Sequence, residues 1–166
     1  KLGRLGNNST MTREIITEII ENFKQQKQCY SRMLDFAGKQ LAILEKSQGQ
    51  VYADEIEVLL ARRNKLLEEI NQNNRENRNL QQRIVKELGV EEFVLGQLES
   101  NLESEQYQAL KEQISNLGKL LEMISEKDQQ SQELMQQAIK SKRQKKPRGS
   151  SRQASQAYKQ SKLTRE

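Results

Sequence analysis

Apolar residues recur at alternating spacings of four and three positions along three long stretches of the chain. Over residues 12–47 this spacing predicts an amphipathic helix whose apolar seam is broken only at Lys27. The other seam residues are Ile16, Ile20, Phe23, Tyr30, Leu34, Ala37, Leu41 and Leu44. Apolar residues beside the seam predict that this helix contacts two neighbours. Thr12 is the expected N-cap and Gly49 the expected C-terminal stop.

A second helix is predicted over residues 54–88, with Asp54 as its N-cap and Gly89 at its end. Its seam positions are Ile56, Leu59, Arg63, Leu66, Ile70, Asn73, Asn77, Leu80, Ile84 and Leu88. The middle of the helix, residues 71–79, is polar. Either water solvates these residues, which the pattern favours, or the asparagines form hydrogen bonds across the core and fix its register.

A short amphipathic segment over residues 90–98 is predicted to form one or two helical turns. Ser104 is the expected cap of a third long helix over residues 105–141. Its seam positions are Tyr107, Leu110, Ile114, Leu117, Leu121, Ile124, Asp128, Ser131, Met135 and Ala138. The apolar character weakens at Asp128 and Ser131, so we expect the end of this helix, beyond about Asp128, to be dynamic.

Together these elements predict an all-α fold, an antiparallel coiled-coil-like bundle of three long helices with a short helical segment between the second and third. Short connections between helices of similar length favour antiparallel neighbours. We expect residues 1–10 to be a leader or flexible extension, residues 11–141 to form the bundle and residues 142–166 to be a basic, disordered tail. Polar seam positions leave open a homodimer in which a second copy completes the seams.

The charge is distributed unevenly between the bundle and the tail. Residues 11–139 carry 16 Lys and Arg against 22 Asp and Glu, whereas residues 140–166 carry 10 basic residues and one acidic residue. The overall charge of +5 therefore describes neither part.

The composition argues against catalysis and metal binding. The chain has no histidine, which is the commonest general base and metal ligand. It has one cysteine, Cys29, which we interpret as a partly buried residue in a reducing compartment, and no phosphate-binding glycine loop. No apolar run approaches the roughly 20 residues of a membrane span. We therefore predict no catalytic, cofactor-binding or metal-binding residue, no small-molecule substrate and no membrane insertion.

The basic tail has three interpretations. It could bind nucleic acid, bind an anionic membrane surface, or act as a solvated arm that docks on a protein. Tyr158 is its only aromatic residue, so it lacks the repeated rings that stack on bases. This favours the solvated or docking arm over nucleic acid, with Tyr158 as a candidate docking residue.

The third helix carries more apolar residues near its end than one seam requires. Two interpretations stay open: ordinary core, or a groove or exposed stripe for a partner helix. The candidate partner-binding residues are Leu117, Leu120, Leu121, Ile124, Leu134, Met135, Ala138 and Ile139.

From about residue 11 to residue 142 the chain resembles the FlgN-type flagellar export chaperones of the bacterial flagellar type III secretion system. Three stretches carry the resemblance: MLDFAGKQLAILEKSQGQ at 33–50, ADEIEVLLARRNKLLEEI at 53–70, and the order of LGV at 88–90, a short apolar segment and a long final helix that includes LGKLLEMISEKDQQSQELMQQAI. The polar residues 71–79 and the basic end of the final helix depart from the family's pattern.

The resemblance implies a cytoplasmic chaperone that binds the helical C-terminal segments of hook-associated proteins. It also implies delivery of these clients to the flagellar export apparatus. Two alternatives remain: a structural coiled-coil or adaptor protein, and a nucleic-acid-associated protein acting through its tail. A related FliT-type chaperone is a close variant of the first hypothesis.

Overall fold

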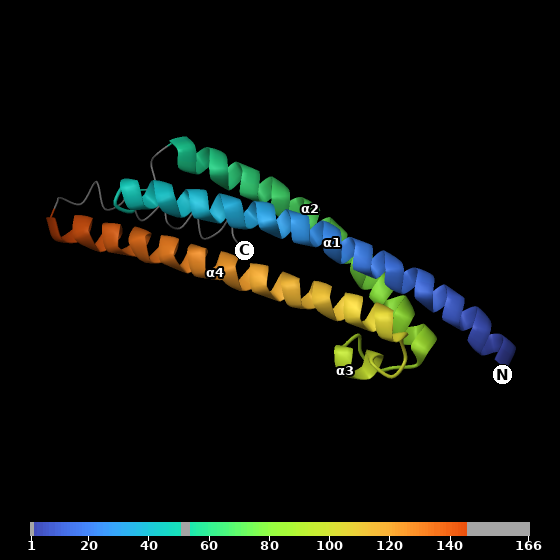
Figure 1. Ribbon diagram of the computed structural model, residues 1–166. Coiled ribbons are helices and arrows are strands. Elements are labelled where there is room, and N and C mark those ends of the chain that lie inside the picture. The colour runs from blue at the N-terminus through green and yellow to red at the C-terminus, as the bar shows by residue number, and fades with distance from the viewer. Residues whose placement is uncertain (1, 51–53, 146–166) are drawn as a thin grey trace. The chain divides into compact units, whose positions relative to one another are not determined.

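The computed structural model describes the backbone of residues 2–50 and 54–145, and the side chains of residues 10–50 and 54–143 (Figure 1). These residues form four helices and no strand: α1 (Leu2–Lys46), α2 (Asp54–Leu88), α3 (Leu95–Leu98) and α4 (Ser104–Lys145). Leu, Gln, Glu, Lys and Arg dominate these helices and lose little rotamer freedom on helix formation. The predicted all-helical class is therefore confirmed.

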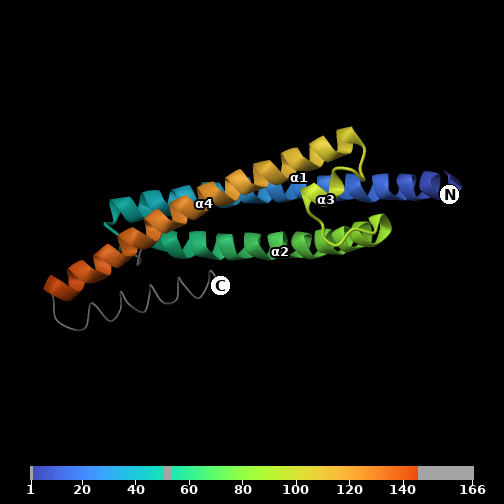
Figure 2. The same cartoon turned by 90° about the horizontal axis from the view of Figure 1, so that it is seen from below.

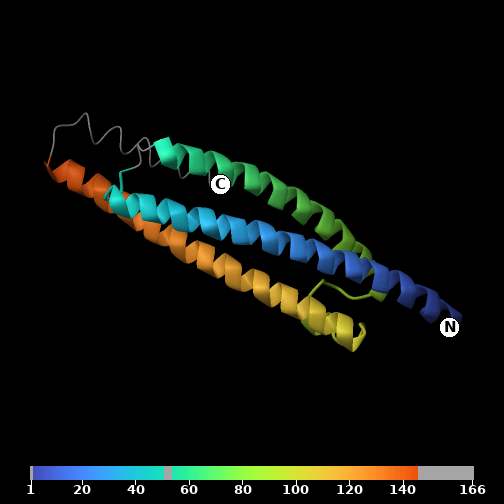
Figure 3. The ribbon, with the colours of Figure 1, turned by 45° about the horizontal axis from the view of Figure 1, so that its top comes forward.

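The predicted bounds are confirmed for α2 but not for the start of α1. Helix α2 runs from Asp54 to Leu88 and is continuous along its length (Figure 3). Helix α1 begins at Leu2, so residues 2–10, which we expected to precede the first helix, belong to it. Thr12 is buried inside the helix and is not its N-cap. Adding turns to an existing helix needs no new nucleus, which explains the longer α1.

Two residues with positive φ end α1. Gln48 has φ 57° and Gly49 has φ 84°, and the Gly49 amide donates a hydrogen bond of 2.7 Å to the Leu44 carbonyl. Gly89, with φ 68°, follows α2 in the same way, and the Val90 amide donates to the Val85 carbonyl. Both stops have the hydrogen bond of a Schellman motif, and both glycines stand where the sequence predicts the stops.

The segment between α2 and α4 contains the predicted short helix, confined to one turn at its C-terminal end. Helix α3 is one turn, Leu95–Leu98, preceded by the extended residue Val94 (Figure 2). The Gln97 side chain accepts hydrogen bonds of 3.0 Å from the amides of Glu91 and Glu92 and so holds the preceding loop. Helix α4 begins at Ser104 as expected but ends at Lys145, four residues beyond the predicted Ser141.

The chain divides into two compact units, although the sequence predicts a single bundle over residues 11–141. Unit 1 consists of Lys1–Tyr30 and Glu69–Lys119, and unit 2 consists of Ser31–Glu68 and Leu120–Glu166. Each of the three long helices contributes one segment to each unit. Helix α3 belongs to unit 1.

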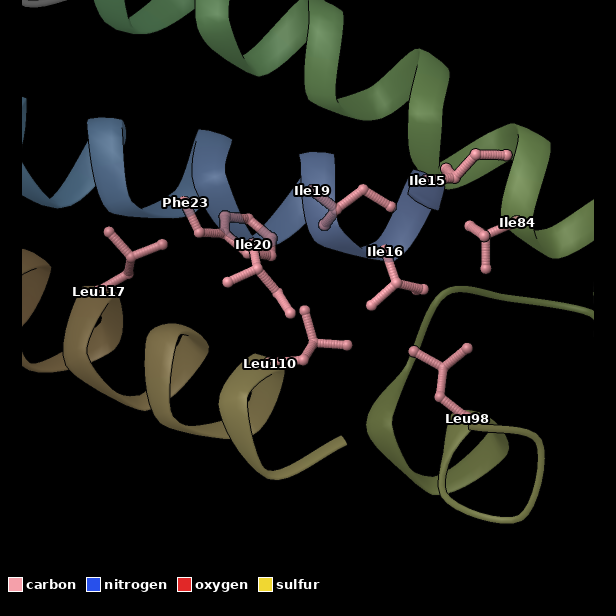
Figure 4. Packing of buried hydrophobic residues seen from close by; sticks show 9 residues of the cluster. All are labelled: Ile15, Ile16, Ile19, Ile20, Phe23, Ile84, Leu98, Leu110 and Leu117. Atoms are coloured by element: carbon pink, nitrogen blue, oxygen red, sulfur yellow. The ribbon is translucent and has the colours of Figure 1, made fainter. Parts of the chain in front are cut away.

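The core of unit 1 draws on all four helices. Figure 4 shows Ile20 and Phe23 of α1 pointing towards Leu110 and Leu117 of α4, while Ile84 of α2 lies near Leu98 of α3. The complete cluster of buried residues is Ile15, Ile16, Ile19, Ile20, Phe23, Ile84, Leu98, Leu110 and Leu117. Burying each of these large side chains stabilises the unit by about 1.5–3 kcal/mol.

Unit 2 has a smaller apolar cluster. Leu44 of α1, Ile56 of α2 and Met135 of α4 are almost fully buried together, and Ile43, Leu60 and Leu134 pack against them. Gly49 lies beside α4 in the same unit. A Cβ atom at Gly49 would lie 2.9 Å from the Ala138 Cβ and still closer to the Leu134 carbonyl.

The observed seam of α1 differs from the prediction at two positions. Gln26 is buried and Lys27 exposed, and Met33 is buried more deeply than Leu34. Ala37, Leu41 and Leu44 are buried as the seam predicts, so the difference is local to these two positions. The gap predicted at Lys27 is filled by the uncharged amide of Gln26.

Candidate partner-binding surface

The structure divides the eight candidate partner-binding residues of α4 into buried and accessible groups. Leu117, Ile124, Met135 and Ala138 are buried, so they belong to the core and are not available to a partner in this conformation. Leu120, Leu134 and Ile139 are half-buried. Only Leu121 is exposed, at 47%. Four of the eight candidates are therefore core residues in this structure, because seam spacing alone does not separate core residues from exposed ones.

Met123 is a second exposed apolar residue on α4, at 48%, and the sequence prediction missed it. It lies off the seam, which is why a search for seam residues does not find it. At about 100° per residue, Met123 and Leu121 lie on opposite flanks of the buried Ile124. The apolar arc of α4 is about 160° wide at this level, broader than the part that the core buries.

A charged residue fills the seam gap of α2 in unit 2. Arg63, 8% exposed, donates two hydrogen bonds to the carboxylate of Asp128 on α4, at 2.8 and 2.7 Å. It donates a third, of 2.7 Å, to the Gln40 side-chain oxygen on α1. The bidentate geometry matches the planar guanidinium to the carboxylate. Each of the three long helices thus supplies one polar side chain to this network.

Amide side chains form a second polar network, in unit 1. The Gln26 side chain donates to the side-chain oxygens of Asn73, at 2.8 Å, and Asn74, at 2.7 Å. Asn73 in turn donates to Gln25 at 3.1 Å. The interpretation that water solvates this part of α2 is therefore wrong for these asparagines, which bond to α1 instead. Such pairs can fix the register of two helices.

Asn77 lies one turn further along α2 and is 1% exposed. Neither its side-chain nitrogen nor its side-chain oxygen has a hydrogen-bond partner among the described residues. A buried polar group without a partner costs about 1–3 kcal/mol. Asn77 therefore stabilises the fold less than an apolar residue buried to the same degree would.

Replacing Asn77 by leucine is expected to raise the free energy of unfolding by about 1 kcal/mol, because it removes the desolvated amide and adds apolar contact. Urea denaturation followed by circular dichroism measures the change. Asn79→Leu, at an exposed position of the same helix, is the control and should change stability by less than about 0.5 kcal/mol. A clear loss of stability in Asn77→Leu would show that the amide is satisfied in solution.

Two further expectations concern metal ions and membranes. Among the described residues, no group of three or more His, Cys, Asp or Glu side chains is arranged to hold a metal ion. None of the helices, within the part of the chain that the structure describes, is both long and apolar enough to cross a membrane.

Tyr158, the candidate docking residue of the tail, lies outside the described residues.

No model of a known protein family, no curated protein and no solved structure matches the chain. Function is therefore inferred from the chain's own residues. The features of the structure that bear on it are the exposed flanks of α4 and the polar networks of the two units.

Proposed function

We propose that this chain is a FlgN-like cytoplasmic export chaperone without enzymatic activity. It binds the helical C-terminal segments of hook-associated flagellar proteins and delivers them to the flagellar export apparatus. The observation that carries the proposal is the pair of half-exposed apolar residues, Leu121 and Met123, on the flanks of α4. The three stretches that resemble FlgN-type chaperones support it, and the last of them includes both residues.

The physical reason for such a chaperone is the client's own apolar stripe. A coiled-coil segment that has not yet assembled exposes apolar surface and is prone to aggregate. A helix with accessible apolar flanks can cover this stripe reversibly, as in other helix-recognition complexes. Binding should be of moderate affinity, because ordering the client segment opposes it. Met123 suits this role, since a flexible thioether adapts to different contact surfaces.

The direction of the helices within each unit is part of the proposal: α2 runs antiparallel to α1 and α4. In unit 2, Arg63 lies beside Gln40 and Asp128, whereas Ile56 lies beside Leu44 and Met135. Residue numbers that increase along α2 therefore decrease along the neighbouring parts of α1 and α4, so α2 runs antiparallel to both. In unit 1, Gln106 of α4 donates to the Arg13 carbonyl of α1, so both begin at the same end.

Co-purification tests the proposed function. The full chain and a chain lacking residues 146–166 are each expressed with the C-terminal helical segments of hook-associated proteins. We expect a stoichiometric complex in both cases, because the contact lies on α4 and not in the tail. The absence of any complex, with the chain still helical by circular dichroism, contradicts the proposal and favours a structural or adaptor protein.

The same pair of chains distinguishes the nucleic-acid alternative. Residues 146–166 hold six Lys or Arg residues and one acidic residue, so a tail-driven interaction with DNA should weaken steeply with salt. We expect no binding of duplex DNA at physiological ionic strength. Salt-dependent binding that disappears with residues 146–166, together with no client complex, favours the nucleic-acid function instead.

A further inference from the structure

The second half of α4 buries few large apolar side chains in unit 2. Ile124 and Met135 are buried, the half-buried Leu134 packs beside Met135, and the remaining buried positions are Ser131 and Ala138. Ser131 is 0% exposed, yet its hydroxyl has no hydrogen-bond partner among the described residues. A segment with little buried apolar area and an unsatisfied polar group has low local stability.

The opposite side of this contact is more apolar. In unit 2, α1 and α2 together bury seven aliphatic or methionine side chains and two polar ones, Gln40 and Arg63. The apolar residues are Met33, Ala37, Leu41 and Leu44 of α1, and Ile56, Leu59 and Leu66 of α2. Removing the second half of α4 would expose part of this face with the Arg63 guanidinium between Leu59 and Leu66 along α2. The face would then combine apolar surface with one desolvated positive charge.

We propose that this face of α1 and α2 is an acceptor groove for an amphipathic helix of a partner protein, which takes the place of the second half of α4. The inference rests on the proposed function and names a second surface through which it acts. Arg63 selects the partner, because a buried guanidinium left without a carboxylate is strongly unfavourable. The partner helix must therefore carry Asp or Glu where α4 carries Asp128.

The contacts of α4 define the remaining pattern of the partner helix. A large apolar residue lies four positions before the carboxylate, as Ile124 does, and another lies seven positions after it, as Met135 does. Small residues are required three and ten positions after the carboxylate, at the places of Ser131 and Ala138. The second small residue is needed because Ala138 lies against the backbone at Gly49.

Weak docking has a direct consequence for hydrogen exchange. We expect backbone amides of residues 120–143 to exchange at least about tenfold faster than those of residues 107–119, away from the frayed helix ends. Hydrogen exchange followed by mass spectrometry measures both segments in one sample. Equal protection of the two halves of α4 contradicts the proposal, since the second half would then not open separately.

A labelled peptide of residues 118–143 serves as the partner helix, and the full chain is the host. In an Asp128→Asn host, the internal helix loses its ion pair while Arg63 remains. We expect this host to bind the peptide at least about tenfold more tightly than the wild-type host, because the internal competitor is weakened. Met135→Ala is a second host, which loosens α4 but keeps both charges.

The carboxylate requirement is tested by the same peptide with D128N. We expect this peptide to bind both loosened hosts at least about tenfold more weakly than the parent peptide. In an Arg63→Met host the two peptides should bind with affinities within about twofold. Fluorescence anisotropy measures the affinities, and hydrogen exchange shows in each host whether residues 120–143 are released.

The proposal is overturned if the parent and D128N peptides bind the Asp128→Asn and Met135→Ala hosts with equal affinity. It is also overturned if neither host binds the parent peptide more tightly than wild type does. Unchanged protection of residues 120–143 in both hosts also overturns it. None of these measurements uses a hook-associated segment, so co-purification with such segments tests the proposed chaperone function separately. A failure of the acceptor-groove proposal can therefore be distinguished from a failure of the proposed chaperone function.

Discussion

Replacing Arg63 by methionine is expected to lower the free energy of unfolding by about 3 kcal/mol. The substitution keeps an unbranched apolar stem, although a shorter one, and removes both hydrogen bonds to Asp128 and the one to Gln40. The Asp128 side chain, 21% exposed, is then left with a carboxylate that is neither paired nor fully hydrated. Urea denaturation followed by circular dichroism measures the loss.

The double variant Arg63→Met, Asp128→Leu separates the ion pair from the packing. With both charges removed, no desolvated carboxylate remains, so we expect the free energy of unfolding to return to within about 1 kcal/mol of wild type. The exposed ion pair of Lys39 with Asp35, at 3.0 Å, provides a control, since Lys39→Met should cost less than about 0.5 kcal/mol. A double variant as unstable as Arg63→Met contradicts this account of the network.

Replacing Gly49 by alanine is expected to lower the free energy of unfolding by about 3 kcal/mol. A φ of 84° is strained for a residue with a side chain, which costs about 1–2 kcal/mol. In addition, the new Cβ would overlap the Leu134 carbonyl of α4 and crowd Ala138, so backbone has to move. Thermal unfolding should show the variant melting well below wild type.

Gly89→Ala is the matched control for the steric part of this effect. Gly89 has a similar φ, 68°, but a Cβ there meets nothing within 4 Å. Its cost should therefore be limited to the backbone strain of about 1–2 kcal/mol. Equal losses for the two variants would mean that the close approach of Gly49 to α4 does not exist in solution.

The sequence predicts the helices well because their signals are local. Glycine at 49 and at 89 stops the two helices where expected, and the acidic first turn of α2 favours a start at Asp54. The start of α1 was not predicted because Gly3, Gly6, Asn7 and Asn8 have low helix propensity, yet no proline lies in residues 2–10 to block an extension of the helix. Helix α4 passes Ser141 for the same reason, since its first proline lies further on, at 147.

The polar interior was harder to predict because it depends on pairing between distant residues. A seam gap at Arg63 and another at Asp128 are both visible in the sequence, 65 positions apart, but nothing local shows that they meet. Likewise, Gln26 reaches Asn73 and Asn74 only because the helices pack in one register. Each polar residue can be seen in the sequence, but its partner is known only from the packing of the helices.

The candidate surface was predicted only in part for a related reason. Periodicity identifies apolar positions but not the direction that each helix turns towards its neighbours. Ile124 and Leu121 follow the same seam, yet one is buried and the other is 47% exposed. Met123 lies outside the seam and was missed, although it is as exposed as Leu121.

The most direct test of the proposed chaperone function is a calorimetric titration of the purified chain with a hook-associated C-terminal helical segment. Three chains are compared: wild type, the double variant Leu121→Asp with Met123→Asp, and the control Val58→Asp. The control changes an equally exposed apolar residue on α2. We predict saturable binding by wild type and by Val58→Asp, and at least about a tenfold loss of affinity in the double variant. Equal affinity of all three chains, or no binding by wild type, would contradict the proposal that α4 holds the client.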